Sequence, residues 1–209
     1  MMAFNGQPHR EQLMHALSKF TDRFIETGMH KAKTTLWACS RFEIIITCET
    51  NPKLYAEHWA EVVGAGGTPL LMDSRDMLRG ICGTGVSIHD DEDLVYLDAH
   101  GDGNLPLLEE LEILLQKDPA ERRICIVIDD FRVEGDPGYR YDTYNGNALC
   151  LDYIAPTLAK ADRKVHIFWP AVPGEQEQDP RTGCVVLLTD NFKLLAEVEP
   201  LCRLLRRHA

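Results

Sequence analysis

Asp93-Leu94-Val95-Tyr96-Leu97-Asp98 is a short apolar run with an acid at each end, and His100 follows two residues later. A second run, Ile124-Cys125-Ile126-Val127-Ile128, ends in the pair Asp129-Asp130. Continuous apolar runs of this length are typical of strands buried on both faces, as in a parallel sheet that helices cover. Ligand sites of such sheets lie at the carboxyl ends of the strands. We therefore predict that the acids meet at one edge of a sheet.

Three carboxylates at one place need an explanation. If the two strands are neighbours, Asp98, Asp129 and Asp130 converge, and clustered carboxylates raise one another's pKa unless a cation lies among them. Hard oxygen donors with room for water suit Mg²⁺ or a similar divalent cation better than zinc. The alternative is that a strand-end Asp caps a helix or forms a turn, with Asp130 capping the following loop and only Asp98 and Asp129 binding the ion.

Composition limits the class of protein. The 209 residues are 44% hydrophobic and 26% charged, which is typical of a globular chain of one domain, with residues 1–22 as a helical N-terminal extension. A net charge of −11 argues against nucleic acid or an anionic membrane as a partner. A homo-oligomer is compatible with the sequence.

The seven cysteines are scattered and form no Cys-x-x-Cys pair, which indicates free thiols in a reducing compartment. The N-terminus lacks an apolar signal region, and no apolar stretch is long enough to span a bilayer. We expect a cytoplasmic protein.

Strand-like and helix-like segments alternate from residue 23 to residue 161. Two strands then follow at 165–169 and 184–188 with only a polar loop between them, before a helical tail at 192–207. Strict alternation builds a parallel sheet with helices on both faces. The predicted fold class is α/β: a doubly wound, mostly parallel, seven-stranded, Rossmann-like sheet with an antiparallel C-terminal hairpin at its edge.

Several motifs in this order resemble those of class I S-adenosylmethionine (SAM) methyltransferases. The run Phe24-Ile25-Glu26-Thr27-Gly28 resembles their first cofactor motif, Cys48-Glu49 the second, and Met72-Asp73-Ser74-Arg75 the third. The strand-end acids resemble the metal site of Mg²⁺-dependent O-methyltransferases of the macrocin (sugar) type and, more distantly, of the catechol type. The likeness covers roughly residues 23–161.

The resemblance implies a cofactor site for SAM. In the family the acid that ends the second strand, here Glu49, holds the ribose hydroxyls, and Asp73 and Ser74 would lie near the adenine. Glu26, Thr27 and Gly28 would border the methionine part. From the residues alone, Glu49 is also explained as a carboxylate at a helix start, and Glu26 as a solvated turn acid.

Two positions depart from the family pattern. No further glycine follows Gly28 in its loop, although glycines there permit close backbone approach. The lysine that the catechol type carries three residues after its first metal acid is replaced by Gly101. His100 is then the nearest candidate base, with Asp98 beside the metal and Asp102 as the other candidate, although His100 is equally explained as a supporting or capping residue.

The leading hypothesis is a SAM-dependent O-methyltransferase, dependent on a divalent cation such as Mg²⁺, that methylates a hydroxyl of a small molecule. The segment 135–146, rich in Gly, Pro, Tyr and Asp, is predicted to cover the acceptor pocket. The alternatives are a non-catalytic methyltransferase-like binding module, and a metal-dependent hydroxylase or hydrolase on the same sheet.

Overall fold

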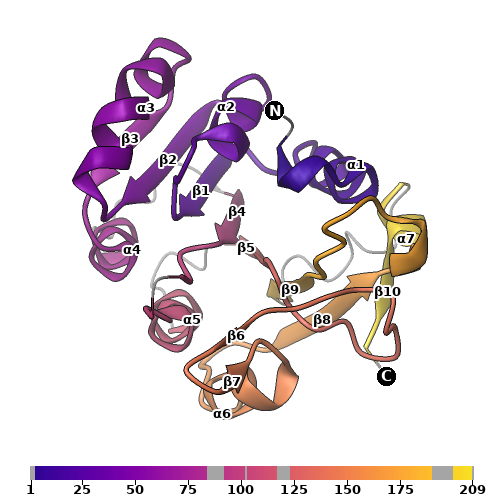
Figure 1. The fold of residues 1–209 in the computed structure, drawn as a ribbon. Coiled ribbons are helices and arrows are strands. Elements are labelled where there is room, and N and C mark those ends of the chain that lie inside the picture. The colour runs from indigo at the N-terminus through magenta and orange to yellow at the C-terminus, as the bar shows by residue number, and fades with distance from the viewer. Residues whose placement is uncertain (1–2, 84–91, 102, 117–122, 190–199, 209) are drawn as a thin grey trace.

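An eight-stranded sheet organises the computed structural model, which describes residues 3–83, 92–101, 103–116, 123–189 and 200–208. The strand order is β10-β8-β9-β5-β4-β1-β2-β3 (Figure 1). The strands are β1 (Arg23–Thr27), β2 (Ile44–Glu49), β3 (Thr68–Leu71), β4 (Glu92–Leu97), β5 (Arg123–Ile128), β8 (Val165–Pro170), β9 (Val185–Thr189) and β10 (Leu205–Arg207).

The five strands that come first in the sequence, β1 to β5, run parallel, as the alternation of elements predicted. Helices connect them because a parallel pair needs a crossover. The helices are α1 (Pro8–Leu17), α2 (Lys33–Cys39), α3 (Pro52–Gly64), α4 (Ser74–Gly83), α5 (Leu107–Leu115), α6 (Leu151–Ala159) and α7 (Leu201–Leu204). Short 3-10 turns lie at η1 (Phe4–Gly6) and η2 (Gly174–Gln176).

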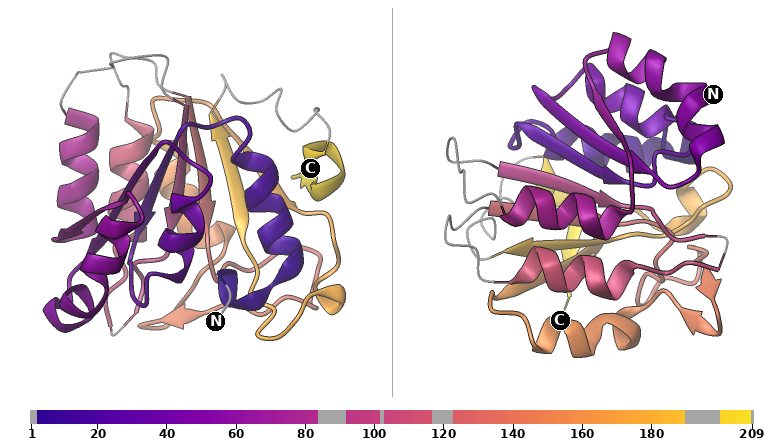
Figure 2. Two further views of the ribbon diagram at one scale, coloured as in Figure 1. Left: turned by 90° about the horizontal axis from the view of Figure 1, so that it is seen from above. Right: turned by 90° about the vertical axis from the view of Figure 1, so that its left-hand side faces the viewer.

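The apolar strands alternate their side chains between two buried layers. Phe24 and Tyr96 pack on the face that η1, α1, α2 and α7 cover, whereas Ile25, Val95 and Leu97 pack on the face that α4, α5 and α6 cover. Figure 2 shows the sheet between these helices. Both faces exclude water, which explains the continuous apolar runs Leu94–Leu97 and Ile124–Ile128 in the middle of the sheet.

The C-terminal part of the sheet confirms the fold class and corrects two details. The strands β8 and β9 pair antiparallel, as predicted, and β9 joins this pair to the parallel strands by pairing with β5. The edge strand is β10, an eighth strand, antiparallel to β8. The tail was predicted as helical to residue 207, but α7 ends at Leu204 and the chain then extends along Trp169 and Phe168.

A two-stranded hairpin, β6 (Thr143–Tyr144) and β7 (Asn147–Ala148), lies within and just after the predicted covering loop. Its turn residues Asn145 and Gly146 both have positive φ, which is the geometry of a tight hairpin turn. Among the described helices, none combines the length and the apolar character that crossing a membrane requires.

Candidate functional site

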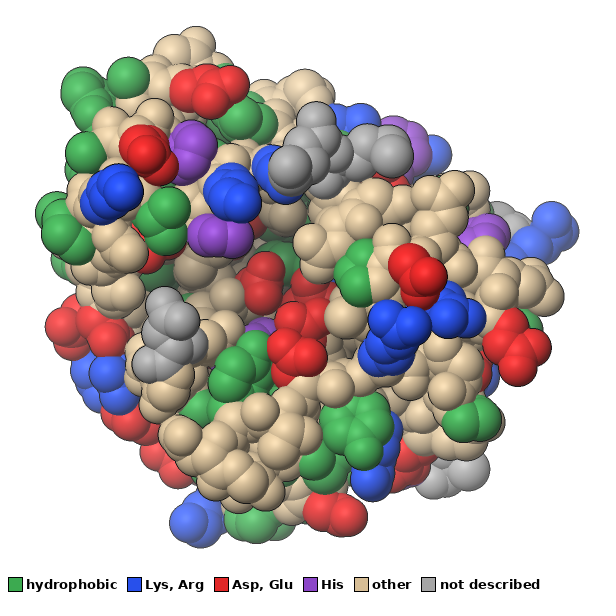
Figure 3. All heavy atoms as spheres, viewed as in Figure 1, with side chains coloured by type: hydrophobic (Ala, Val, Ile, Leu, Met, Phe, Trp, Pro, Cys, Tyr) green, Lys and Arg blue, Asp and Glu red, His purple; other side chains and the backbone are tan. Residues whose placement is uncertain are grey.

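The carboxyl ends of β1, β2, β4 and β5 form one continuous edge. The register pairs Thr27 with both Cys48 and Leu97, and Leu97 with Ile128, so the residues that follow these strands lie side by side. Figure 3, seen in the same view as Figure 1, shows acidic side chains gathered in a hollow in the middle of this face. The predicted convergence of strand-end acids is therefore present in the structure.

Three side chains at this edge could hold a metal ion: Asp98, His100 and Asp130. One ligand atom from each lies within 4.8 Å of the others. His100 Nε2 lies 3.7 Å from Asp98 Oδ1 and 3.6 Å from Asp130 Oδ2. The His100 side chain is only 2% exposed, and its Nε2 has no hydrogen-bond partner among the residues that the structure describes. Asp130 Oδ1 is likewise buried without a partner. Unpaired buried polar atoms are costly, and a cation would satisfy both.

The charges of this group are not balanced among its own members. Partial burial first, and then the negative charges of Asp129 and Asp130, raise the pKa of Asp98 above its ordinary value, although 37% of its side chain is exposed. Burial and Asp129 also raise the pKa of Asp130, against the lowering influence of His100 and Thr182. A divalent cation would remove this repulsion, so the donor set fits such an ion. The imidazole extends the choice beyond Mg²⁺ to Mn²⁺, Fe²⁺ or Zn²⁺.

Asp129, which the sequence also predicted as a metal ligand, is bonded to other side chains of the protein. It is 2% exposed, and its Oδ1 pairs with the guanidinium of Arg10 and accepts the Asp130 backbone N–H at 2.8 Å. Its Oδ2 accepts the Tyr96 hydroxyl at 2.5 Å. Despite the burial, the Arg10 charge and these donors lower the pKa of Asp129. We therefore replace Asp129 by His100 in the candidate ligand set.

The predicted cofactor acids occupy the neighbouring strand ends but are already bonded within the protein. Glu49 is 8% exposed and accepts the backbone N–H groups of His30 and Asn51, both at 2.8 Å. Each carboxylate oxygen has a second acceptor position, so ribose hydroxyls can still bind it. Asp73 accepts three bonds from Arg75, which lower its pKa.

Glu26 is buried at the end of β1, so it is not the solvated turn acid that the sequence left as an alternative. It is 2% exposed, and one of its oxygens accepts the hydroxyls of Thr35 and Thr47. Burial raises its pKa to about 7, although both hydroxyls oppose the shift. Its carboxylate thereby links β1 to α2 and to β2, and direct contact with a cofactor amino group stays a prediction.

Thr27 and Gly28 join the two groups of acids. The backbone N–H of Asp98 donates to the carbonyl of Thr27 at 3.1 Å, and also lies 3.2 Å from the Thr27 hydroxyl. Gly28 has φ +87°, and a Cβ there would lie 2.5 Å from the Asp98 carbonyl oxygen. Only glycine permits this close approach, which holds the end of β1 against the candidate ligand Asp98.

Two charged residues of the site were missed by the sequence reasoning: Arg10 and Glu110. Glu110 of α5 is 1% exposed, burial raises its pKa to about 7, and hydrogen bonds with Ser74 and Thr27 partly oppose that rise. Its Oε1 has no partner. Both residues share a signal, because each lies on the apolar stripe of its helix. Arg10 is followed by Leu13, Met14 and Leu17, and Glu110 is flanked by Leu107, Leu111 and Leu114.

The predicted covering loop contacts the site through the Tyr144 side chain and through Asp142, whose backbone N–H donates to the Asp130 carbonyl at 2.9 Å. The Tyr144 ring centroid lies 5.3 Å from that of His100, and Asn145 donates to the Gly103 carbonyl at 3.1 Å. Tyr139 instead donates to the Val172 carbonyl, and Arg140 pairs with Asp179. Asp102, the second candidate base, lies outside the described residues.

No family model and no curated protein matches the sequence. Solved structures do match the fold. The chain aligns with the O-methyltransferase TomG of Streptomyces achromogenes in complex with SAM, at TM-score 0.59 and 17% identity over 86% of this chain and 79% of that one. The fold is that of the class I methyltransferases. The Bacillus cereus O-methyltransferase in complex with S-adenosylhomocysteine (SAH) gives 0.56 and 16% identity, over 87% and 80%. Cofactor-bound Rv0187 from MTB gives 0.53 and 16%, over 86% and 79%.

Proposed function

We propose that this protein is a SAM-dependent O-methyltransferase that holds a divalent cation at Asp98, His100 and Asp130 and methylates a hydroxyl of a small molecule. The observation that carries the proposal is the pair of buried, unpartnered atoms, His100 Nε2 and Asp130 Oδ1, in a group whose ligand atoms fall within 4.8 Å. The SAM-bound and SAH-bound neighbours of the same fold support the cofactor.

Cofactor binding and cation binding would use two neighbouring groups of strand-end residues. Glu49, Asp73 and Ser74 at the ends of β2 and β3 would bind the cofactor, and the ends of β4 and β5 beside them would hold the cation. When bound, the cation would lower the pKa of an acceptor hydroxyl, and SAM would supply the methyl group. Approach of the hydroxyl to the methyl carbon within roughly 3–3.5 Å is then the main requirement.

His100 changes role in this arrangement. A nitrogen that binds a cation has no lone pair left for a proton, so we assign His100 Nε2 as a ligand and not as the base. Asp98 has 37% of its side chain exposed, the largest fraction in the group, and is the member that an acceptor molecule can contact. Tyr144 covers His100 on one side and would limit the shape of the acceptor.

Small hydroxylated acceptors fit the charge of the protein. The net charge of −11 and an acidic hollow disfavour polyanions such as nucleic acid (Figure 3). Adjacent acceptor oxygens, as in a vicinal diol, would complete the coordination of the cation beside the three protein ligands.

The experiment measures cofactor binding and metal dependence separately. Purified protein treated with EDTA is titrated with SAH in a calorimeter, and the titration is repeated with Mn²⁺ present. Methyl transfer from labelled SAM to aromatic and sugar vicinal diols is then measured with and without Mn²⁺. We expect SAH binding in both titrations and transfer only with Mn²⁺. Full transfer after EDTA treatment would refute the metal part, and no binding of SAH would refute the methyltransferase.

One observation favours a second candidate, a metal-binding module that does not use SAM. Both oxygens of Glu49 already accept backbone donors, and the loop after β1 buries Met29 and Ala32 where the family pattern has glycines. Mn²⁺ binding without any SAH binding would support this candidate over the enzyme.

A further inference from the structure

The N-terminal helix α1 precedes the alternating β-α units, yet one of its side chains contacts an acid of the site. Arg10 is 3% exposed, and its guanidinium pairs with Asp129 at the end of β5. The same guanidinium donates to the Thr182 carbonyl at 2.7 Å. Burying a guanidinium is favourable only when its donors are paired, so this position is specified by the partners.

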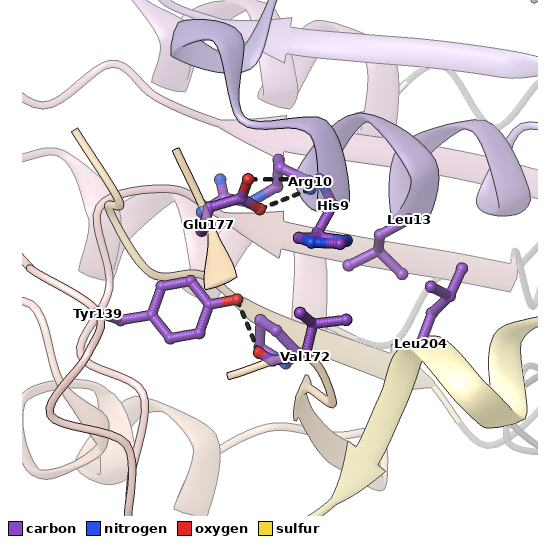
Figure 4. Close-up of a pocket in the computed structure, with 8 residues that line it drawn as sticks. His9, Arg10, Leu13, Tyr139, Val172, Glu177 and Leu204 are labelled. Atoms are coloured by element: carbon purple, nitrogen blue, oxygen red, sulfur yellow. Dashed lines mark hydrogen bonds between the residues drawn. The ribbon is translucent and has the colours of Figure 1, made fainter. Parts of the chain in front are cut away.

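The segment between β8 and β9 holds α1 in place. Glu177 accepts the backbone N–H groups of His9 and Arg10 at 3.4 and 3.2 Å, and Figure 4 shows its carboxylate facing the start of the helix. Gln7 and Thr182 exchange two hydrogen bonds, each 2.9 Å long. A cavity of about 10 Å³ between α1, Tyr139 and Val172 leaves room for one water at most. Arg10 therefore has little freedom to leave Asp129.

Asp129 and Asp130 are adjacent in sequence but differ in how many hydrogen bonds their carboxylates accept. Asp129 accepts bonds from Arg10, the Tyr96 hydroxyl and the Asp130 backbone N–H. Asp130 has positive φ and keeps one buried oxygen unpartnered beside the unpartnered His100 Nε2. Pairing with Arg10 thereby removes the Asp129 carboxylate from the cation site, whereas the Asp130 carboxylate remains available to bind an ion.

We propose that Arg10 is a positioning residue: an internal counter-cation that keeps Asp129 out of the coordination sphere and leaves Asp98, His100 and Asp130 for a single divalent ion. The inference rests on the proposed function and adds a role for a helix outside the β-α repeat. Asp98, Asp129, Asp130 and Arg10 together carry a net charge of −2, which one divalent cation balances.

The charges predict how binding of Mn²⁺ alone responds to substitution, measured by calorimetry at one pH. Arg10→Met removes a nearby positive charge and frees a carboxylate, so Mn²⁺ should bind about tenfold tighter or more. Asp129→Asn leaves a buried, unpaired guanidinium beside the site and should weaken binding about tenfold. The double variant restores the original net charge and should bind within about threefold of the wild type, on the same Coulomb argument.

Glu177→Gln is the matched control. It weakens the hold on α1 while leaving Arg10 and Asp129 intact, so Mn²⁺ affinity should stay that of the wild type. The thermal unfolding midpoint of each variant shows whether it is folded. The double variant serves even if either single variant fails to fold, because it contains neither a buried unpaired cation nor a buried unpaired anion.

The outcomes are distinct. Wild type that binds no Mn²⁺ defeats the proposed metal site and this inference with it. Wild type that binds, together with a double variant that loses binding, shows Asp129 to be a ligand and defeats this inference alone. A Glu177→Gln variant whose affinity changes as that of Arg10→Met does would show that docking of α1, and not the charge of Arg10, is responsible.

Discussion

Two groups of strand-end acids lie at the same edge of the sheet and differ in how far the protein satisfies them. At the ends of β1, β2 and β3, Glu26, Glu49 and Asp73 accept hydrogen bonds from hydroxyl, backbone and guanidinium donors. At the ends of β4 and β5, His100 and Asp130 keep buried atoms without a partner. The comparison indicates that the group at the ends of β4 and β5 is the one left to bind a cation, whereas internal hydrogen bonds already hold the acids of the other group in place.

The largest expected effect comes from the unsatisfied group. His100→Ala removes one of three ligand atoms, and we expect it to weaken Mn²⁺ binding more than about a hundredfold and to abolish methyl transfer, because removing even a supporting partner of a metal ligand costs about 10–100-fold. SAH binding, which depends on the other group, should be retained. Calorimetry with each ligand measures both.

His15→Ala is the matched control, since His15 is an exposed histidine of α1. It should change neither titration. Equal loss of SAH and Mn²⁺ binding in His100→Ala would contradict the division of the edge into two separate groups.

The apolar runs explain why the fold was predictable. Leu94 to Leu97 and Ile124 to Ile128 are buried on both faces, and this is the pattern that the sequence displayed. The eighth strand was not visible, because Leu205, Arg206 and Arg207 carry no such apolar pattern, although they pair with β8 in the structure. Short edge strands depend on the neighbour that receives them, which one segment of sequence does not reveal.

The acids of the site were identified by their position, but their partners were not. Asp98 and Asp130 lie where the strand ends predicted. Asp129 left the group because Arg10, 119 residues away in sequence, reaches it from another helix. Glu26 and Glu49 were satisfied by the hydroxyl groups of Thr35 and Thr47 and by backbone N–H groups. Which donors reach these acids depends on how the loops fold, so the motif residues alone do not predict them.

The second expected effect concerns Glu26, the most deeply buried acid of the satisfied group. Its pKa in the folded protein is about 7, above the ordinary value of 4.5, because of burial. The folded protein therefore binds a proton that the unfolded chain has released, so its stability falls as the pH rises from about 4.5 to 7. Glu26→Gln abolishes that fall and should gain about 3 kcal/mol relative to wild type between pH 4.5 and pH 8.

Urea unfolding at several pH values measures this difference, and the amide oxygen that replaces the carboxylate can still accept from Thr35 and Thr47. Glu57→Gln, an exposed substitution on α3, is the control and should leave the pH dependence of the free energy of unfolding unchanged. Parallel curves for wild type and Glu26→Gln would mean that Glu26 is ionised at no cost, and that the satisfied group is more solvated than the structure shows.

The smallest expected effect is a difference between two glycine variants, and it tests the contact that joins the two groups. Gly28 and Gly66 both have positive φ, +87° and +95°, but a Cβ at Gly28 would meet the Asp98 carbonyl oxygen at 2.5 Å, whereas a Cβ at Gly66 would meet nothing within 4 Å. Alanine at either position pays for the left-handed backbone, about 1 kcal/mol. Gly28→Ala should lose a further 1–3 kcal/mol, roughly the usual penalty for overpacking. Because it displaces the Asp98 backbone, it should also weaken Mn²⁺ binding, and Gly66→Ala should not. Equal losses of stability, with Mn²⁺ affinity unchanged in both variants, would show that the end of β1 does not position Asp98 and that the two groups act independently.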